Sequence, residues 1–271
     1  MRNFIVMVCL LMTMCGGLVI NPLPVVAQPP LPWSRQQQIP NFDPETEPPV
    51  LVADQNRTVH AFSSQAFDDD DSGSGGYGIY YNQWALQKGW TKPNNILLSP
   101  LYNDARVMGV VLDPYGIFHL VFVGGQEIEA HVYYSQAAAI EADNANKWSP
   151  PIVVGDSAIT PRSVGLVLDD NRLVMLYAGN RDGMGIYSVY STDFGNTWSD
   201  PVPVFLTDNA KIKPYFLVLT RGQSGWLHAT WNVVTDGGQG RGIYYAHTRF
   251  ENGQYTWEQP TTLATAAGGL G

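Results

Sequence analysis

The sequence predicts an all-β chain, built as a β-propeller with four recognisable four-stranded units. Aromatic, glycine and proline residues are plentiful, with 14 Tyr, 10 Phe, 8 Trp, 27 Gly and 19 Pro, whereas charged residues make up 14%. A Trp-x-x-Pro signature occurs four times at a near-constant period. Helix periodicity is missing, because short apolar or alternating runs end at Gly, Pro, Asp or Asn. These features are typical of short strands joined by tight turns.

The first 27 residues are expected to be a segment apart from the fold. Arg2 is followed by an apolar run, and Val-Val-Ala precedes Gln28, as in a secretory signal peptide with its cleavage site. A retained membrane anchor is the alternative. Both cysteines, Cys9 and Cys15, lie in this leader, so the mature chain would have neither thiols nor disulfides.

Removal of the leader leaves an acidic chain. It takes away one Arg and no acid, which changes the formal net charge from −9 to −10. A strongly acidic surface argues against a nucleic-acid partner. We therefore expect a secreted or extracytoplasmic protein with no membrane span after leader removal.

Residues 28–46 are interpreted as a Pro-rich linker or a closing strand. Trp33 lies 57 residues before Trp90, in phase with the repeat that follows. It could therefore belong to the outer strand of another blade, or its position could be a coincidence.

The repeated units are predicted at about 47–98, 103–155, 160–206 and 211–265, with a tail at 266–271. Their signature tryptophans are separated by 58, 50 and 59 residues, at positions Trp90, Trp148, Trp198 and Trp257. Self-similarity at such a period indicates a propeller or a similar array. Each unit contains a strand ending in a turn, a second strand, an apolar-Tyr strand and an outer strand, as in "VVLDPYGIFHLVF" followed by Val132-Tyr133-Tyr134. Four short antiparallel strands describe one blade.

One stretch in the third unit carries a family resemblance. Ser191, Asp193, Gly195 and Trp198 form the pattern Ser-x-Asp-x-Gly-x-x-Trp, which resembles the Asp-box, or bacterial neuraminidase repeat, of sialidase-like β-propellers. The other three copies keep only parts of it. The resemblance implies a six-bladed ring, so the four repeats here would form an incomplete, open ring. It also implies that the stretch lies in the hairpin before the outer strand, away from any substrate.

The residue types of this stretch fit a structural role. Asp193 can accept backbone N–H groups within a tight turn. Gly195 can adopt a positive φ. Trp198 can pack over the turn and against its blade.

The sequence offers two possible metal sites. His60, His119 and His228 are residue types that bind metals, but His119 and His228 occupy the same place in their repeats, and Val174 fills that place in the third unit. Blade-equivalent residues lie around a ring and do not converge, so we predict packing and no metal site. The acidic run Asp68–Asp71 could bind Ca²⁺, although its spacing fits no standard calcium loop and a solvated loop is the simpler interpretation.

Cationic residues begin three of the predicted inner strands, at Arg106, Arg162 and Lys213, with Glu47 in the first unit. The sialidase resemblance implies an arginine cluster that binds a sugar carboxylate, because guanidinium matches carboxylate geometry. These three residues are our candidate ligand-binding set. The alternative is a polar strand start that pairs with neighbouring acids.

The same resemblance implies a Tyr–Glu nucleophile pair and an Asp acid/base. Tyr215 is a weak candidate without an evident Glu partner, and Asp113 and Asp169 are weak candidates for the carboxylic acid. Glycosidases generally need two placed carboxylates, and spacing selects no pair here.

We therefore predict a binding module for a glycan or an extracellular protein. The alternative is an exo-acting glycoside hydrolase of sialidase type whose catalytic set is incomplete in this chain. A structural surface-layer component is a third possibility. No cofactor is predicted.

Overall fold

A computed structural model describes residues 39–42, 45–67, 75–126, 129–155 and 164–265. Several features that the sequence singled out lie outside these residues: the leader at 1–27, Trp33 with most of the 28–46 segment, the Asp68–Asp71 run, Arg162 and the 266–271 tail. No helix within the described ranges is long and apolar enough to cross a membrane.

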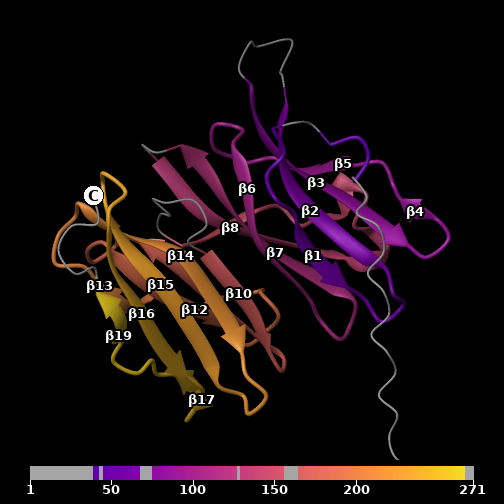
Figure 1. Cartoon of the computed structure of the whole chain (residues 1–271). Coiled ribbons are helices and arrows are strands. Elements are labelled where there is room, and N and C mark those ends of the chain that lie inside the picture. Colours follow the sequence, from indigo (N-terminus) through magenta and orange to yellow (C-terminus); the bar gives the residue numbers. More distant parts are fainter. Residues whose placement is uncertain (1–38, 43–44, 68–74, 127–128, 156–163, 266–271) are drawn as a thin grey trace, which may run out of the picture. The chain divides into compact units, whose positions relative to one another are not determined.

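Four antiparallel sheets follow one another along the chain (Figure 1). The first contains β1 (Val50–Ala53), β2 (Val59–Phe67), β3 (Gly76–Ala85) and β4 (Gly89–Trp90), and β5 (Asn94–Leu97) also pairs with β3. The second contains β6 (Ala105–Leu112), β7 (Ile117–Gln126), β8 (Glu129–Ala138) and β9 (Ile152–Gly155).

The third sheet contains β10 (Val164–Asp169), β11 (Arg172–Gly179), β12 (Gly185–Ser191) and β13 (Val202–Leu206). The fourth contains β14 (Ile212–Arg221), β15 (Leu227–Thr235), β16 (Gly240–Thr248) and β19 (Thr261–Thr265). Within each sheet the strands pair in chain order, which is the meander of a propeller blade. The prediction of four four-stranded propeller blades is therefore confirmed.

Strand β7 is apolar on both faces, so it packs against a neighbouring sheet on each side. Its residues alternate between two faces, as strand geometry requires. One set packs in the core shared with the first sheet, and it consists of Phe118, Leu120 and Phe122. The other set includes Val121 and Val123, which pack in the core shared with the third sheet. A strand that is apolar on both faces is stable only when both are covered.

Cores of this kind join each sheet to the next along the chain. The third and fourth sheets share two apolar clusters, which include Leu176 with Trp231, and Val174 with Leu227. Among the described strands, none of the first sheet makes an extended contact with any of the fourth. The four blades therefore form an open series, as predicted.

In the second, third and fourth units, a hairpin before the outer strand extends beyond its own sheet and contacts the preceding sheet. In the second unit it contains two 3₁₀ turns, η1 (Ala139–Glu141) and η2 (Ala145–Lys147). In the fourth it contains a small two-stranded sheet, β17 (Phe250–Glu251) and β18 (Gln254–Tyr255). In the third it is the stretch from Ser191 to Trp198, whose pattern resembles an Asp-box and which is called the Asp-box hairpin below. These hairpins shape the site described below.

Candidate functional site

The predicted cationic residues are engaged by nearby acids. Arg106 Nη1 lies 2.6 Å from Glu47 Oε1 and its Nε lies 2.8 Å from Asp104 Oδ1, while its guanidinium sits 3.2 Å from the centroid of the Tyr77 ring. Burial opposes the charge of Arg106, but hydrogen bonds to Asp104 and Glu47 outweigh it and raise the pKa of the guanidinium. Its charge is thus balanced within the fold.

The structure gives contacts for Lys213 and for the candidate nucleophile Tyr215, but it does not describe Arg162. Lys213 Nζ lies 3.3 Å from Asp236 Oδ1. Tyr215 is half-buried, and its ring packs edge-on against Phe216 with centroids 4.7 Å apart. Arg162 lies outside the described residues. The proposed ligand-binding set therefore remains a prediction.

Asp113 closes the turn between β6 and β7. Its Oδ1 accepts hydrogen bonds from the backbone N–H groups of Tyr115 and Ile117, at 2.9 and 2.8 Å. Its Oδ2 lies 3.2 Å from His119 Nε2. The side chain is buried, and these three contacts hold the turn and orient the histidine.

Asp169 occupies the corresponding turn of the third sheet with different partners. Its carboxylate accepts hydrogen bonds from Arg221 Nε at 2.6 Å, Tyr255 Oη at 2.6 Å and Arg172 Nη2 at 3.0 Å. Burial would raise the pKa of Asp169, but the hydrogen bonds from Tyr255, Arg221 and Arg172 outweigh it and lower that pKa. The ionised Asp169 carboxylate therefore connects the third sheet to the fourth through its hydrogen bonds with Arg221 and Tyr255.

An Asp–His–Tyr corner recurs in the first two sheets. His119 Nδ1 lies 2.7 Å from Tyr134 Oη, and His60 Nδ1 lies at the same distance from Tyr81 Oη. Burial lowers the pKa of both histidines, although Asp113 and Asp54 partly offset this effect. No group of three or more metal-ligating side chains within the described ranges is placed to hold an ion. The corner contributes to packing.

The Asp-box hairpin covers the corner of the second sheet. Phe194 stacks on His119 with ring centroids 6.4 Å apart, and Trp198 meets Tyr134 edge-on at 5.2 Å. Phe194 and Gly195 take positive φ angles of 58° and 86°, which turn the backbone so that the Phe194 carbonyl accepts a hydrogen bond from Tyr134 Oη at 3.1 Å.

Internal hydrogen bonds hold this hairpin in shape. Ser191 Oγ donates to Asp193 Oδ1 at 2.8 Å and accepts from the Gly195 N–H at 2.8 Å. Asp193 also accepts from the Thr197 N–H at 2.9 Å and from its hydroxyl at 2.6 Å. The hydroxyl of Thr197 is the largest cause of the lowered pKa of Asp193. The stretch therefore connects two blades and has no free group for catalysis.

The fourth sheet keeps part of the corner, and no hairpin among the described residues covers it. His228 Nδ1 lies 2.7 Å from Tyr245 Oη, as in the first two sheets. Thr220 is paired with His228 across the two strands. The rings of His228 and Tyr245 are half-buried, whereas those of His119 and Tyr134 are fully buried. His247 stacks beside them, 5.6 Å from Tyr245 and 6.3 Å from His228 between ring centroids.

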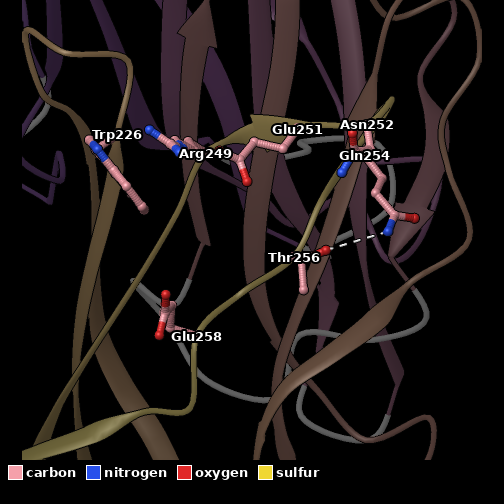
Figure 2. A pocket seen from close by; sticks show the side chains of 7 residues that line it. All are labelled: Trp226, Arg249, Glu251, Asn252, Gln254, Thr256 and Glu258. Carbon is pink, nitrogen blue, oxygen red and sulfur yellow. Dashed lines mark hydrogen bonds and ion pairs between the residues drawn. The ribbon is translucent and has the colours of Figure 1, made fainter.

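A pocket adjoins this open corner (Figure 2). Its volume is about 120 Å³. It is lined by the end of the β14–β15 turn, the β17–β18 hairpin and the segment that follows, through Trp226, Arg249, Glu251, Asn252, Gln254, Thr256 and Glu258. Trp226 is half-buried and the other six side chains are exposed. The pocket thus offers one aromatic surface surrounded by guanidinium, carboxylate, amide and hydroxyl groups.

Contacts among these residues arrange the pocket wall. The Arg249 guanidinium lies 4.7 Å from the Trp226 ring centroid and forms an ion pair with Glu251. The Trp226 ring also contacts His247 at 5.0 Å between centroids, so the pocket is continuous with the open corner. Gln254 Nε2 reaches Thr256 Oγ1 at 3.5 Å, as the dashed line in Figure 2 shows.

Sequence reasoning did not identify this pocket. The sequence feature that could have indicated it is that the fourth unit differs from the other three units at two places. Its β14–β15 turn carries "RGQSGW" in place of a short Asp turn, and its hairpin is "TRFENGQYTW", longer than the Asp-box. Phe250 and Tyr255 of this hairpin still pack against the third sheet, whereas Arg249, Glu251 and Gln254 are exposed and available for another role.

Comparison with known proteins supports the fold. No protein-family model matches the chain, and the search of curated proteins found no match. Solved structures do match: a protein of unknown function from Dyadobacter fermentans has 15% identity and a TM-score of 0.56, over 78% of this chain and 68% of that one. A thermostable family-43 glycoside hydrolase has 15% identity and a TM-score of 0.52, over 80% and 76%.

A third solved structure is the α-L-arabinanase of Penicillium chrysogenum complexed with arabinobiose. It has 14% identity and a TM-score of 0.56, and the match covers 81% of this chain and 68% of that one. At such identities the likeness establishes the β-propeller fold and leaves the activity open. The similarity extends to propeller enzymes and does not single out the Asp-box sialidases.

Proposed function

We propose that this chain is an exported carbohydrate-binding β-propeller and that the pocket beside Trp226 is its binding site. The observation that carries the proposal is the composition of that pocket. An indole presents an apolar surface to the C–H face of a sugar ring. Arg249, Glu251 and Gln254 beside it supply donors and acceptors for sugar hydroxyls.

The size of the pocket indicates how a glycan would bind. Closed small-molecule sites usually enclose about 300–1,000 Å³, and this pocket is smaller, at about 120 Å³. It cannot engulf an oligosaccharide. The proposal is therefore that one or two residues of a longer, exposed glycan chain rest against Trp226.

The structural neighbours favour a sugar over a protein ligand. Two of them are glycoside hydrolases, and the arabinanase was solved with a bound disaccharide. A polar pocket is also a poor site for the aromatic and aliphatic anchors of a protein partner. An extracellular protein ligand would instead be expected at an apolar surface.

A glycoside hydrolase is the second candidate function. Glu251 and Glu258 both line the pocket, and glycoside hydrolysis needs two carboxyl groups across the scissile bond. Arg249 forms an ion pair with Glu251. A sialidase-type reaction would instead use the predicted arginine cluster with a Tyr–Glu pair, and the described residues around Tyr215 provide less support for it.

A glycan array with the purified protein tests the binding proposal. We expect binding to a subset of plant or microbial polysaccharides, and lower binding by Trp226→Ala. Tyr115→Ala is the matched control, because Tyr115 is an exposed aromatic residue in another sheet. If Trp226→Ala leaves glycan binding unchanged, this pocket is not the binding site.

A reducing-sugar assay on the glycans that bind separates the two functions. Product release that is lost in both Glu251→Gln and Glu258→Gln would establish a hydrolase. Glu129→Gln, at an exposed glutamate of the second sheet, serves as the control. Binding without product release would leave the chain as a binding module.

A further inference from the structure

The three internal contacts between blades follow one plan. In each, the hairpin before an outer strand lies on the corner of the preceding sheet. At the second sheet, Phe194 and its carbonyl meet His119 and Tyr134. We call this arrangement of hairpin on corner a joint.

The other two joints use different residues in the same place. At the third sheet, Phe250 lies beneath the Arg172 guanidinium at 4.2 Å, and Tyr255 bonds to Asp169. At the first sheet, Asn94 Nδ2 donates to the carbonyl of Asp143 in the second hairpin, and Trp148 meets Phe62 edge-on. Aromatic side chains thus take part in every joint.

One half of a joint is left open on the fourth sheet. Its corner is the ring cluster of His228, Tyr245 and His247, which no hairpin covers in the described part of the chain. Among described residues the Tyr245 hydroxyl bonds only to His228. The Tyr134 hydroxyl, at the same place in the second sheet, also donates to a hairpin carbonyl. Tyr245 is therefore ready to donate to an incoming carbonyl.

The other half of a joint is left open on the first sheet. Its hairpin, residues 84–92, turns at Gln87 and Gly89 with φ angles of 72° and 71°. Leu86 at the tip is 63% exposed. Two residues of the Asp-box hairpin, Phe194 and Gly195, also have positive φ, but they are consecutive, whereas Lys88 separates Gln87 from Gly89.

We propose that the first hairpin of one copy of this chain docks on the ring cluster of a second copy. The three internal joints show that a hairpin of one unit can pack on the corner of another. Charge favours the same pairing: Lys88 and Lys92 are exposed on the hairpin, and beside the ring cluster the two acids Glu251 and Glu258 outnumber the one cation Arg249, which pairs with Glu251. Opposite charges on the two surfaces favour this orientation over others.

The contact is head to tail. Each copy contributes a different surface, so the association is heterologous and leaves one hairpin and one ring cluster free in every dimer. Further copies can add at both ends until a ring closes. The contact is also weaker than an internal joint, because Thr230 and Asn232 occupy the places of Val121 and Val123 on this face. Association should therefore depend on concentration.

Sedimentation velocity at protein concentrations from about 1 μM to 1 mM tests the proposal. We expect the mean mass of the wild type to rise through dimers to larger species. Leu86→Glu removes the apolar tip and adds repulsion from Glu251 and Glu258. Tyr245→Glu removes the hydroxyl that meets the carbonyl. Each variant should weaken association about tenfold or more.

A mixture of the two variants gives the sharpest result. The Leu86→Glu chain keeps an intact ring cluster, and the Tyr245→Glu chain keeps an intact hairpin. An equimolar mixture should form dimers that contain one of each and should grow no further. A non-specific association could not stop at this composition.

Ile140→Glu is the matched control, because Ile140 is 92% exposed on the hairpin of the second sheet. It should associate like the wild type. A wild type that stays monomeric up to 1 mM, or equal loss of association in Ile140→Glu, would overturn the proposal. If Tyr245→Glu does not fold, Leu86→Glu alone decides, since its side chain is largely outside the core. The test needs no glycan, so its outcome is independent of the proposed binding site.

Discussion

The hydroxyl of Tyr134 donates a hydrogen bond to the backbone carbonyl of Phe194, 3.1 Å away and 60 residues later in the sequence. This bond joins the second sheet to the hairpin of the third. The same hydroxyl lies 2.7 Å from His119 Nδ1 and 3.0 Å from Gln136 Oε1. Burial raises the pKa of Tyr134 far above its ordinary value, so the phenol stays a donor at any physiological pH. The joint therefore depends on one buried hydroxyl.

Replacing Tyr134 by Phe should lower the free energy of unfolding by about 1–3 kcal/mol, because buried partners lose their hydrogen bond. Urea titration followed by tryptophan fluorescence measures this change. Tyr115→Phe is the control, since Tyr115 is 77% exposed, and it should change stability by less than about 0.5 kcal/mol. Equal stability of the two variants would contradict the role given to the Tyr134 hydroxyl.

Two glycines with the same backbone conformation should differ in their tolerance of a methyl group. Gly195 and Gly253 have φ angles of 86° and 85°. A Cβ on Gly195 would lie 2.0 Å from the Tyr134 hydroxyl, whereas nothing lies within 4 Å of one on Gly253. We expect Gly253→Ala to cost about 1 kcal/mol from backbone strain, and Gly195→Ala to cost about 3 kcal/mol or more.

Thermal and urea unfolding of both alanine variants provide the comparison. A smaller loss in Gly195→Ala than in Gly253→Ala would show that the hairpin does not press against the second sheet as described. The pair isolates the steric effect, since the strain of a positive φ is common to both.

Stability should fall on mild acidification because two histidines are buried. Burial lowers the pKa of His60 and His119 from the ordinary value of 6.5. The unfolded chain therefore binds protons that the folded chain does not. This stability is fully present above about pH 6.5 and is lost as the pH falls toward the lowered pKa of the folded state.

The slope should reach at most about 1.4 kcal/mol per pH unit for each histidine. His119→Gln should reduce the slope of unfolding free energy between about pH 7 and pH 5, and His60 should supply what remains. Urea titrations at a series of pH values measure it. If His119→Gln does not change the slope of unfolding free energy against pH, groups other than His119 take up the protons on unfolding.

Trp226→Ala should weaken glycan binding about tenfold, or about 1.4 kcal/mol, with little loss of stability because the ring is only half-buried. Isothermal titration calorimetry with a glycan selected from the array measures the change. Gln223→Ala is the control, as an exposed residue in the turn that precedes Trp226. An equal effect of both substitutions would indicate a disturbed turn and not a lost sugar contact.

The repeat made the fold predictable, because four in-phase copies of one pattern constrain each other. Trp148, Trp198 and Trp257 all pack at contacts between neighbouring sheets, which is why their spacing matches the period. The apolar run at β7 likewise predicted a strand. Such patterns are local, and a strand displays them wherever it lies.

The site could not be predicted in the same way. The carboxylates of Asp113 and Asp169 have similar sequence surroundings, but Asp113 holds a histidine, whereas Asp169 holds Arg172 of its own blade and Arg221 and Tyr255 of the next. Arg221 and Tyr255 follow Asp169 by 52 and 86 residues. No spacing rule connects residues that only the packing of two sheets brings together.

The sequence alone determined the number of blades, their strand order and the role of the Asp-box pattern as a turn, because each follows from short-range periodicity and turn chemistry. Only the tertiary structure decided which corner stays uncovered. In three sheets a hairpin from the next blade lies on the corner, and on the fourth the rings of His228 and Tyr245 remain half-exposed beside Trp226. Exposure is a property of what lies opposite in space, and the local sequence of a corner does not reveal it.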